Sequence, residues 1–270
     1  MHTSIRHILN TTKARVLALG PQPLSEGLKA GKAGFEKRDF FSAVADAKAD
    51  GLVPVITEVK PASPGRAFRE IPPAVAAELA LEMEEAGAVA ISVLTEPGVF
   101  RGSLENLDAV RKTVCLPVLR KDFIIDRMQL EEAENDLVLL IAGILGEELG
   151  AFVELALEKG FEPLVEVHNR KELDLALETD AKVIGINNRD FETLKIDLGT
   201  TEELAPLIRE YDLDHGTRHL IISESGMNSP GDVRRVIQAG TDAVLIGSAL
   251  MESASVFDKT KEFVQSAGWR

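Results

Sequence analysis

The sequence predicts a (β/α)8 barrel, also called a TIM barrel, from three observations. Short, nearly continuous apolar runs recur along the chain, and each is followed by a stretch with the spacing of an amphipathic helix. The runs are rich in Val and Ile without polar alternation, which is typical of strands buried on both faces of a parallel sheet. Eight such units fit into 270 residues, close to the ~250 residues typical of this barrel.

The eight apolar runs are the expected strands, and they lie at residues 52–59, 88–94, 116–119, 137–142, 163–167, 182–186, 220–223 and 242–246. Start and stop signals place helices between them. Pro72-Pro73 opens a helix that runs to Gly87. After the fifth run, Asn169 is expected to cap a helix, and Glu172 three residues later is expected to complete a capping box.

Residues 1–50 precede the first strand and are expected to form an N-terminal helical extension of a single barrel domain covering residues 1–270. Two apolar-periodic stretches, 5–19 and 40–48, predict its helices. They either plug the bottom of the barrel or flank its mouth. A doubly wound sheet is the main alternative fold, but it favours a Gly-rich turn after the first strand. Here Val59 is followed by Lys-Pro-Ala-Ser-Pro-Gly, which favours the barrel.

Composition restricts the partners. Lys and Arg total 30 against 44 Asp and Glu, a net charge of -14, so nucleic acid and anionic membranes are not expected partners. No apolar run approaches the roughly 20 residues of a membrane span. Cys115, the only cysteine, predicts a core or strand-start residue and fits a reducing, cytoplasmic location. The five histidines lack helical metal-ligand spacing, so no metal is expected.

Polar side chains stand at the carboxyl ends of the apolar runs, where a barrel places its chemistry. Charged groups inside otherwise apolar segments carry a desolvation cost that a purely structural role explains poorly. They are therefore the candidate functional residues: Glu58, Lys60, Lys121, Glu166, Asn187, Arg189 and Glu224.

Residue spacing refines these candidates. Glu58 and Lys60 lie two apart, so in a strand they project to one face and can pair, either as a catalytic couple or as a structural ion pair. Lys121 is a candidate functional residue or a solvated loop lysine. Glu166 lies between Val165 and Val167; a buried carboxylate tends toward a raised pKa, which suits proton transfer near neutral pH. Its alternative role is to pair with an inward-facing lysine.

Two Gly–Ser pairs end the last two strands. Ser225 and Gly226 follow the seventh run, and Gly247 and Ser248 follow the eighth. Barrels often bind phosphate at this place through backbone N–H groups and a helix N-terminus. The pairs predict a phosphate site, with simple strand-end turns as the alternative.

Seven segments together resemble the indole-3-glycerol-phosphate synthase family. They are Glu58-Val-Lys-Pro-Ala-Ser-Pro, Ile91-Ser-Val-Leu-Thr-Glu-Pro, Leu119-Arg-Lys-Asp-Phe-Ile-Ile-Asp, Leu164-Val-Glu-Val-His-Asn, Gly185-Ile-Asn-Asn-Arg-Asp, Ile222-Ser-Glu-Ser-Gly and Leu245-Ile-Gly-Ser-Ala-Leu-Met. The resemblance implies closure of 1-(2-carboxyphenylamino)-1-deoxyribulose 5-phosphate to indole-3-glycerol phosphate, with loss of carbon dioxide and water. It implies no metal or organic cofactor, and it leaves association with other enzymes of tryptophan biosynthesis open.

The resemblance also implies roles in proton transfer. Lys121 is the general acid at the ketone oxygen, and Glu166 is the principal base or the partner of the leaving hydroxyl. Lys60 is a second acid or a phosphate contact, and the division of the dehydration roles between Lys60 and Glu166 stays open. Asn187 orients Glu58 or the substrate hydroxyls.

The expected binding residues follow from the same resemblance. Arg189 holds the aryl carboxylate with support from Ser63. Phe123 forms a wall for the substrate ring, with Phe100 as a weaker candidate. Ser225, Gly226, Gly247 and Ser248 hold the phosphate.

Two other functions are compatible with a lysine-containing barrel. A Schiff-base aldolase would use Lys121 or Lys60 as a nucleophile. A non-catalytic phosphosugar-binding protein would keep the pocket without the chemistry, although such a protein is expected to have lost at least one of Glu58, Lys60, Lys121 and Glu166.

Overall fold

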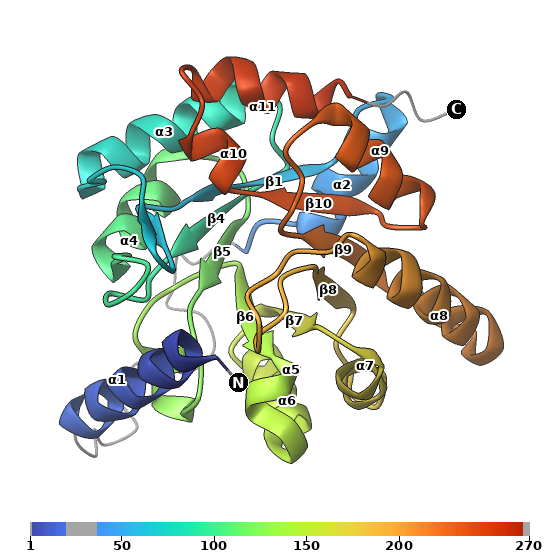
Figure 1. Cartoon of the computed structure of the whole chain (residues 1–270), viewed down its shortest axis with the longest axis horizontal. Helices are drawn as coiled ribbons and strands as arrows, with labels where there is room; N and C mark the ends of the chain where they lie inside the picture. Colours follow the sequence, from blue (N-terminus) through green and yellow to red (C-terminus); the bar gives the residue numbers. More distant parts are fainter. Residues whose placement is uncertain (1, 20–36, 267–270) are drawn as a thin grey trace.

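Eight parallel strands close into a barrel in a computed structural model that describes residues 2–19 and 37–266. Around the barrel the order is β1-β10-β9-β8-β7-β6-β5-β4 (Figure 1). The strands are β1 (Val55–Val59), β4 (Ala90–Leu94), β5 (Val118–Lys121), β6 (Leu137–Ile141), β7 (Glu162–Val167), β8 (Val183–Asn187), β9 (Leu220–Glu224) and β10 (Ala243–Ile246). The predicted barrel is confirmed, and every predicted run overlaps its strand. Strands β5, β7, β8 and β9 extend one or two residues beyond the predicted bounds.

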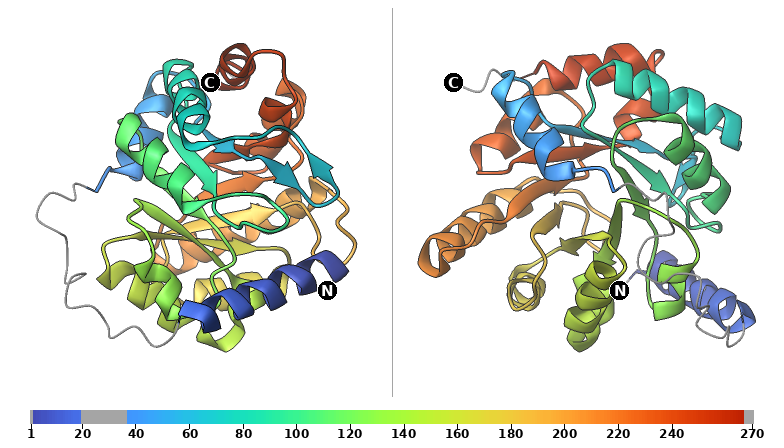
Figure 2. Two further views of the ribbon diagram at one scale, coloured as in Figure 1. Left: turned by 90° about the vertical axis from the view of Figure 1, so that its left-hand side faces the viewer. Right: turned by 180° about the vertical axis from the view of Figure 1, so that it is seen from behind.

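Helices cover the outside of the barrel (Figures 1 and 2). They are α3 (Pro73–Glu85), α4 (Leu104–Thr113), α5 (Ala142–Leu145), α6 (Leu149–Glu158), α7 (Arg170–Leu177), α8 (Gly199–His215), α9 (Pro230–Gln238), α10 (Ser248–Met251) and α11 (Val256–Val264). A short 3-10 turn, η3 (Gly146–Glu148), joins α5 to α6. Their apolar sides and the outward-facing strand residues form two buried clusters, while inward-facing residues form a third.

The third strand–helix unit differs from the predicted pattern. Between β5 and β6 the chain forms only a 3-10 turn, η2 (Arg127–Glu131), instead of an α-helix. Asp126 and Gln129 form a capping box at the N-terminus of this turn. The Gln129 side chain also accepts from the Ile125 N–H at 2.8 Å and donates to the Phe123 carbonyl at 3.0 Å. The side chain of Gln129 thus satisfies backbone groups of the loop locally, and the short segment needs no helix.

The cap of α7 confirms half of its prediction. The Asn169 side chain accepts from the Glu172 N–H at 3.1 Å, as expected of an N-cap. The Glu172 carboxylate does not return to the Asn169 backbone. It accepts instead from the N–H of His168, the residue before the cap, at 2.9 Å. The predicted capping box is therefore wrong.

The sequence left two positions open for the N-terminal helices, the bottom of the barrel and its mouth, and the structure has one helix at each. Helix α2 (Phe40–Ala49) closes the bottom, where Lys48 lies 2.5 Å from Asp242 just before β10. Helix α1 (Thr3–Leu19) lies beside the mouth, and Ile5 contributes to the cavity there. Figure 2 shows the two helices at separate places on the molecule. No helix in the described ranges is long and apolar enough to cross a membrane.

A small antiparallel pair follows β1 and has no counterpart in the sequence prediction. It consists of β2 (Ala62–Ser63) and β3 (Arg66–Ala67), and it brings Ser63 to the rim of the barrel. Cys115 is exposed in the link between α4 and β5, which begins only at Val118. The prediction of a core or strand-start residue is therefore wrong.

Candidate active site

A cavity of about 430 Å3 lies at the carboxyl ends of the strands. It is lined by the twelve residues to which the sequence interpretation gave a main catalytic or binding role, and by Phe100, the weaker candidate. Glu224, a candidate without an assigned role, does not line it. The twelve residues are Glu58, Lys60, Ser63, Lys121, Phe123, Glu166, Asn187, Arg189, Ser225, Gly226, Gly247 and Ser248.

The end of β1 supplies an ion pair to the cavity. The Lys60 ammonium lies 2.7 Å from a Glu58 carboxylate oxygen, as the two-residue spacing predicted. Val59 between them belongs to the outer apolar core. A Cβ on Gly247 would lie 2.2 Å from the same Glu58 oxygen, so this position needs glycine for Glu58 to occupy the cavity.

Lys121 at the end of β5 lies between two buried carboxylates. Its ammonium donates to Glu224 and lies 3.6 Å from a Glu166 oxygen. Burial alone would lower the pKa of Lys121. The negative charges of Glu224, Glu166 and Glu58 outweigh burial and raise that pKa above its ordinary value. Lys121 therefore carries a proton that it can donate to a bound molecule.

The two carboxylates beside Lys121 have opposite pKa shifts. Burial raises the pKa of Glu166, but the positive charges of Lys121 and His168 prevail, and its pKa falls to about 2. The predicted raised pKa at Glu166 is therefore wrong, because its cationic neighbours outweigh its desolvation. Burial raises the pKa of Glu224 to about 7, and the negative charge of Glu166 adds to this rise while Lys121 opposes it.

Glu224 is the main residue to which the sequence interpretation gave no role. It is fully buried at the end of β9. A Cβ on Gly185 would lie 2.2 Å from its Oε1 atom, so glycine in the neighbouring strand β8 makes room for it. The signal was present in the sequence, since Glu224 ends an apolar run just as Glu166 interrupts one.

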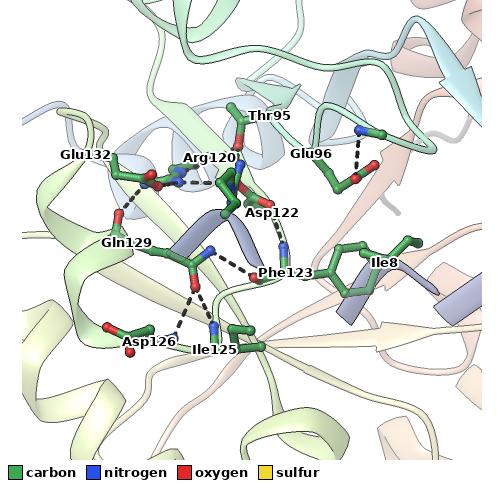
Figure 3. Close-up of polar contacts among 12 residues, drawn as sticks. Ile8, Thr95, Glu96, Arg120, Asp122, Phe123, Ile125, Asp126, Gln129 and Glu132 are labelled. Carbon is green, nitrogen blue, oxygen red and sulfur yellow. Dashed lines mark hydrogen bonds and ion pairs between the residues drawn. The ribbon is translucent and has the colours of Figure 1, made fainter. Parts of the chain in front are cut away.

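A buried polar network holds the loop after β5 (Figure 3). The Arg120 side chain points away from the cavity, with a terminal nitrogen 3.2 Å from Asp122 and 2.6 Å from Glu132. Thr95 donates to the same Asp122 carboxylate at 2.8 Å. Arg120 and Asp122 flank Lys121 in the chain, so these contacts fix the strand end that carries the lysine.

Aromatic rings form one wall of the cavity. The Phe123 ring centroid lies 6.1 Å from that of Phe100 and 6.5 Å from that of Phe191. The sequence named Phe123 and Phe100 as ring walls, but it gave no signal for Phe191, which comes from the loop after β8. The Glu96 carboxylate fixes the Phe100 loop by accepting from the Phe100 N–H at 2.8 Å.

Asn187 and Arg189 share one face at the end of β8, as predicted. The Asn187 side-chain oxygen accepts from the Arg189 N–H at 2.9 Å. One guanidinium nitrogen of Arg189 donates to the Leu194 carbonyl at 3.3 Å. The guanidinium also lines the cavity, where its fork suits a carboxylate ligand.

The two Gly–Ser pairs lie together on another side of the cavity. Ser225 and Gly226 both have positive φ, +67° and +93°. The buried side chain of Asn188 donates to the Ser225 carbonyl at 3.0 Å and supports this turn. Gly247 precedes α10, which begins at Ser248. Turned backbone and hydroxyl groups of this kind suit an anionic oxygen ligand.

The fold and the site define the class of protein: a (β/α)8-barrel enzyme with buried ionisable groups at the carboxyl ends of its strands. The family model for indole-3-glycerol phosphate synthase matches residues 5–263. The chain therefore belongs to the indole-3-glycerol phosphate synthase family, which makes it a carboxy-lyase of tryptophan biosynthesis.

Curated relatives agree with this assignment. The chain is 46% identical over 215 residues to the indole-3-glycerol phosphate synthase of Methanocaldococcus jannaschii, covering 78% of this chain and 77% of the relative. It is 44% identical to that of Aquifex aeolicus, covering 78% and 80%. A solved structure of N-acetylmannosamine-6-phosphate 2-epimerase from Clostridium perfringens shares the fold, with a TM-score of 0.54 and 12% identity over 81% of this chain and 93% of that one.

Proposed function

We propose that Lys121 is the general acid of the ring closure. The carbon of the substrate ring attacks the ketone carbon, and the Lys121 ammonium donates its proton to the ketone oxygen as negative charge develops there. The carboxylate then leaves as carbon dioxide, and its bonding electrons restore the conjugation of the ring. The observation that carries this proposal is the position of Lys121, whose side chain lines the cavity and forms ion pairs with Glu166 and Glu224.

Glu166 acts as the base of the later dehydration. Its carboxylate is ionised while Lys121 holds a proton, because the ammonium lowers its pKa. Once Lys121 has given up that proton, the stabilising charge is gone and Glu166 becomes a stronger base. Lys121 thus acts first, as the acid of the ring closure, and Glu166 acts afterwards, as the base of the dehydration.

Lys60 is the second acid candidate, because it lines the cavity and its ammonium lies 2.7 Å from Glu58. It protonates the leaving hydroxyl or contacts the phosphate, and Glu166 and Lys60 share the dehydration. Asn187, also in the cavity, orients Glu58 or the substrate hydroxyls.

Binding divides the cavity into three parts. Arg189 and Ser63 hold the aryl carboxylate, and Phe123 packs against the ring. The phosphate binds at Ser225, Gly226, Gly247 and Ser248. The phosphorylated small molecule is the only ligand that this proposal requires, and the reaction needs no metal or organic cofactor. A cytoplasmic location follows from the single unpaired cysteine.

The test is conversion of carboxyphenylamino-deoxyribulose phosphate to a fluorescent indole product, with and without a chelator. Lys121→Ala is expected to lower turnover by at least roughly a hundredfold, the usual contribution of a positioned acid, while substrate still binds. An active Lys121→Ala enzyme would remove the proposed general acid. An ammonium held by Glu224 is a poor nucleophile, so borohydride is expected to trap no substrate on Lys121.

A further inference from the structure

His168 is a buried ring directly behind Glu166. It does not line the cavity, but its Nε2 atom lies 3.4 Å from Glu166 Oε1, an ion-pair contact and not a hydrogen bond. Its Nδ1 atom lies 2.9 Å from Glu172 Oε2. The backbone N–H of His168 donates to that same Glu172 oxygen at 2.9 Å. One carboxylate therefore anchors the residue at two points while the far side of the ring faces the other carboxylate.

The surroundings leave this ring little freedom. The Phe191 ring packs on it with centroids 3.9 Å apart. Glu172 is itself fixed, because Asn169 donates to its other oxygen at 2.9 Å. A Cβ on Gly143 would lie 2.6 Å from that oxygen, so a glycine in α5 leaves room for the anchor. A ring held in this way keeps a constant position relative to Glu166.

The two oxygens of Glu166 are thereby distinguished. Oε1 faces His168, whereas Oε2 accepts no hydrogen bond from the described residues and lies 3.6 Å from the Lys121 ammonium. Oε2 is thus the oxygen on the side of the proton donor. When Oε1 is held in place, Oε2 points in a fixed direction. Proton transfer needs a base atom that is oriented in this way.

We infer that His168 is a positioning residue that holds Oε1 of Glu166 through an ion pair and thereby directs Oε2 toward Lys121 and the substrate. The inference rests on the role proposed for Glu166 as base. Its physical basis is the chain of contacts Glu172–His168–Glu166, in which a cationic ring joins two carboxylates. The charged groups that face the ring are Glu166 on its own strand, Glu172 from α7 and Asp190 from the loop after β8.

The charge on the ring agrees with this geometry. Burial alone would lower the pKa of His168, but Glu166 and Glu172 raise it to about 9. Both ring nitrogens therefore carry a proton at neutral pH and can serve both carboxylates. The neutral ring has only one N–H, so it can donate to only one carboxylate once the pH exceeds about 9.

The chain offers a matched control in a second buried histidine. His219 has its Nδ1 atom 2.5 Å from Asp212 Oδ1, and its backbone N–H donates to Asp212 Oδ2 at 3.0 Å. Like His168, His219 is anchored to one carboxylate through its backbone N–H and its Nδ1 atom, although here the two contacts use different oxygens. However, His219 immediately precedes β9, at the end of the barrel opposite the cavity. A change there tests what loss of a buried histidine–carboxylate pair does to the fold alone.

The experiment compares His168→Gln, His168→Met, His219→Gln and Glu166→Gln in turnover rate, KM and melting temperature. We expect His168→Met to lower kcat by roughly tenfold to a hundredfold, the scale of a misplaced reacting group, with KM changed less than threefold. His168→Gln, which keeps a neutral donor, is expected to lose less. His219→Gln is expected to lower the melting temperature and leave kcat within twofold of the unaltered enzyme.

The pH profile supplies a readout that a purely structural role does not move. The kcat of the unaltered enzyme is expected to fall as pH rises through about 9. The kcat of His168→Met is expected to show no such fall. Unchanged kcat in His168→Met, or an equal loss in His219→Gln, overturns the inference while leaving the role of Glu166 intact. An active Glu166→Gln enzyme instead removes the proposed base itself, so the two failures are distinguishable.

Discussion

The Arg15 guanidinium lies 3.1 Å from the Asp122 carboxylate, joining residues 107 positions apart. Arg15 belongs to α1, and Asp122 directly follows Lys121. The N-terminal helix is thus fastened to the strand end that carries the proposed general acid. Ile5 from the same helix lines the cavity, so this contact also holds a wall of the site.

Arg15→Ala is expected to affect binding more than chemistry. Asp122 is fully buried but keeps Arg120 and Thr95 as partners, so we expect a loss of about 1–3 kcal/mol of stability. KM should rise as α1 loosens, while kcat falls less. Thermal unfolding and steady-state kinetics measure the two effects, and Arg15→Lys should restore part of each. A fall in kcat with unchanged KM would show that α1 acts on Lys121 and not on the cavity wall.

Arg189→Ala is expected to raise KM by roughly tenfold to a hundredfold, since a hydrogen bond to a charged group contributes about 1.5–3 kcal/mol. The side chain has only one direct protein acceptor in the described ranges, the Leu194 carbonyl, so its removal should leave the fold stable. Steady-state kinetics provide the measurement, and an analogue without the aryl carboxylate is the control. That analogue should bind the variant and the unaltered enzyme equally, whereas a pure turnover defect would contradict the binding role.

Gly185→Ala is expected to lower turnover without touching any residue that contacts substrate in the proposal. The added Cβ would lie 2.2 Å from Glu224 Oε1 and 2.7 Å from Leu164, so Glu224 must move away from Lys121. We expect overpacking to cost about 1–3 kcal/mol of stability and kcat to fall. Gly150→Ala is the control, because nothing lies within 4 Å of its added Cβ. Full turnover in Gly185→Ala would show that Lys121 does not depend on Glu224.

Stability should depend on pH through His168. Its pKa is raised from 6.5 to about 9 on folding, so the folded state holds this proton more tightly than the unfolded chain does. The resulting stabilisation is fully present below pH 6.5 and is lost as pH rises through about 9. The melting temperature difference between the unaltered protein and His168→Gln should therefore be largest below pH 6.5 and shrink toward pH 9. A difference that grows with pH would contradict a protonated His168.

The placement of the candidate residues was predictable because of a simple geometric rule. Parallel strands in a barrel bring their carboxyl ends to one rim, so polar residues ending apolar runs meet there whatever their separation in sequence. The pairing of Glu58 with Lys60 followed from the two-residue period of a strand in the same way. Neither inference needed tertiary detail.

Protonation was not predictable in this way. Glu166 and Glu224 both interrupt apolar sequence, and burial raises the pKa of each. The direction of each pKa shift depends on all the charged neighbours, because electrostatic interactions are strong in a buried site. His168 adds a second positive charge beside Glu166, whereas the negative charge of Glu166 adds to the raised pKa of Glu224. Sequence spacing says nothing about how close these charges lie.

The sequence by itself determined the barrel, its strand ends and the set of residues around the cavity, because hydrophobic periodicity and strand direction are local properties. Only the tertiary structure decided that α1 flanks the mouth while α2 closes the bottom, and that a 3-10 turn replaces a helix after β5. It also decided that the pKa of Glu224 is raised and that of Glu166 is lowered. These outcomes depend on contacts between distant segments, which form only when the barrel closes.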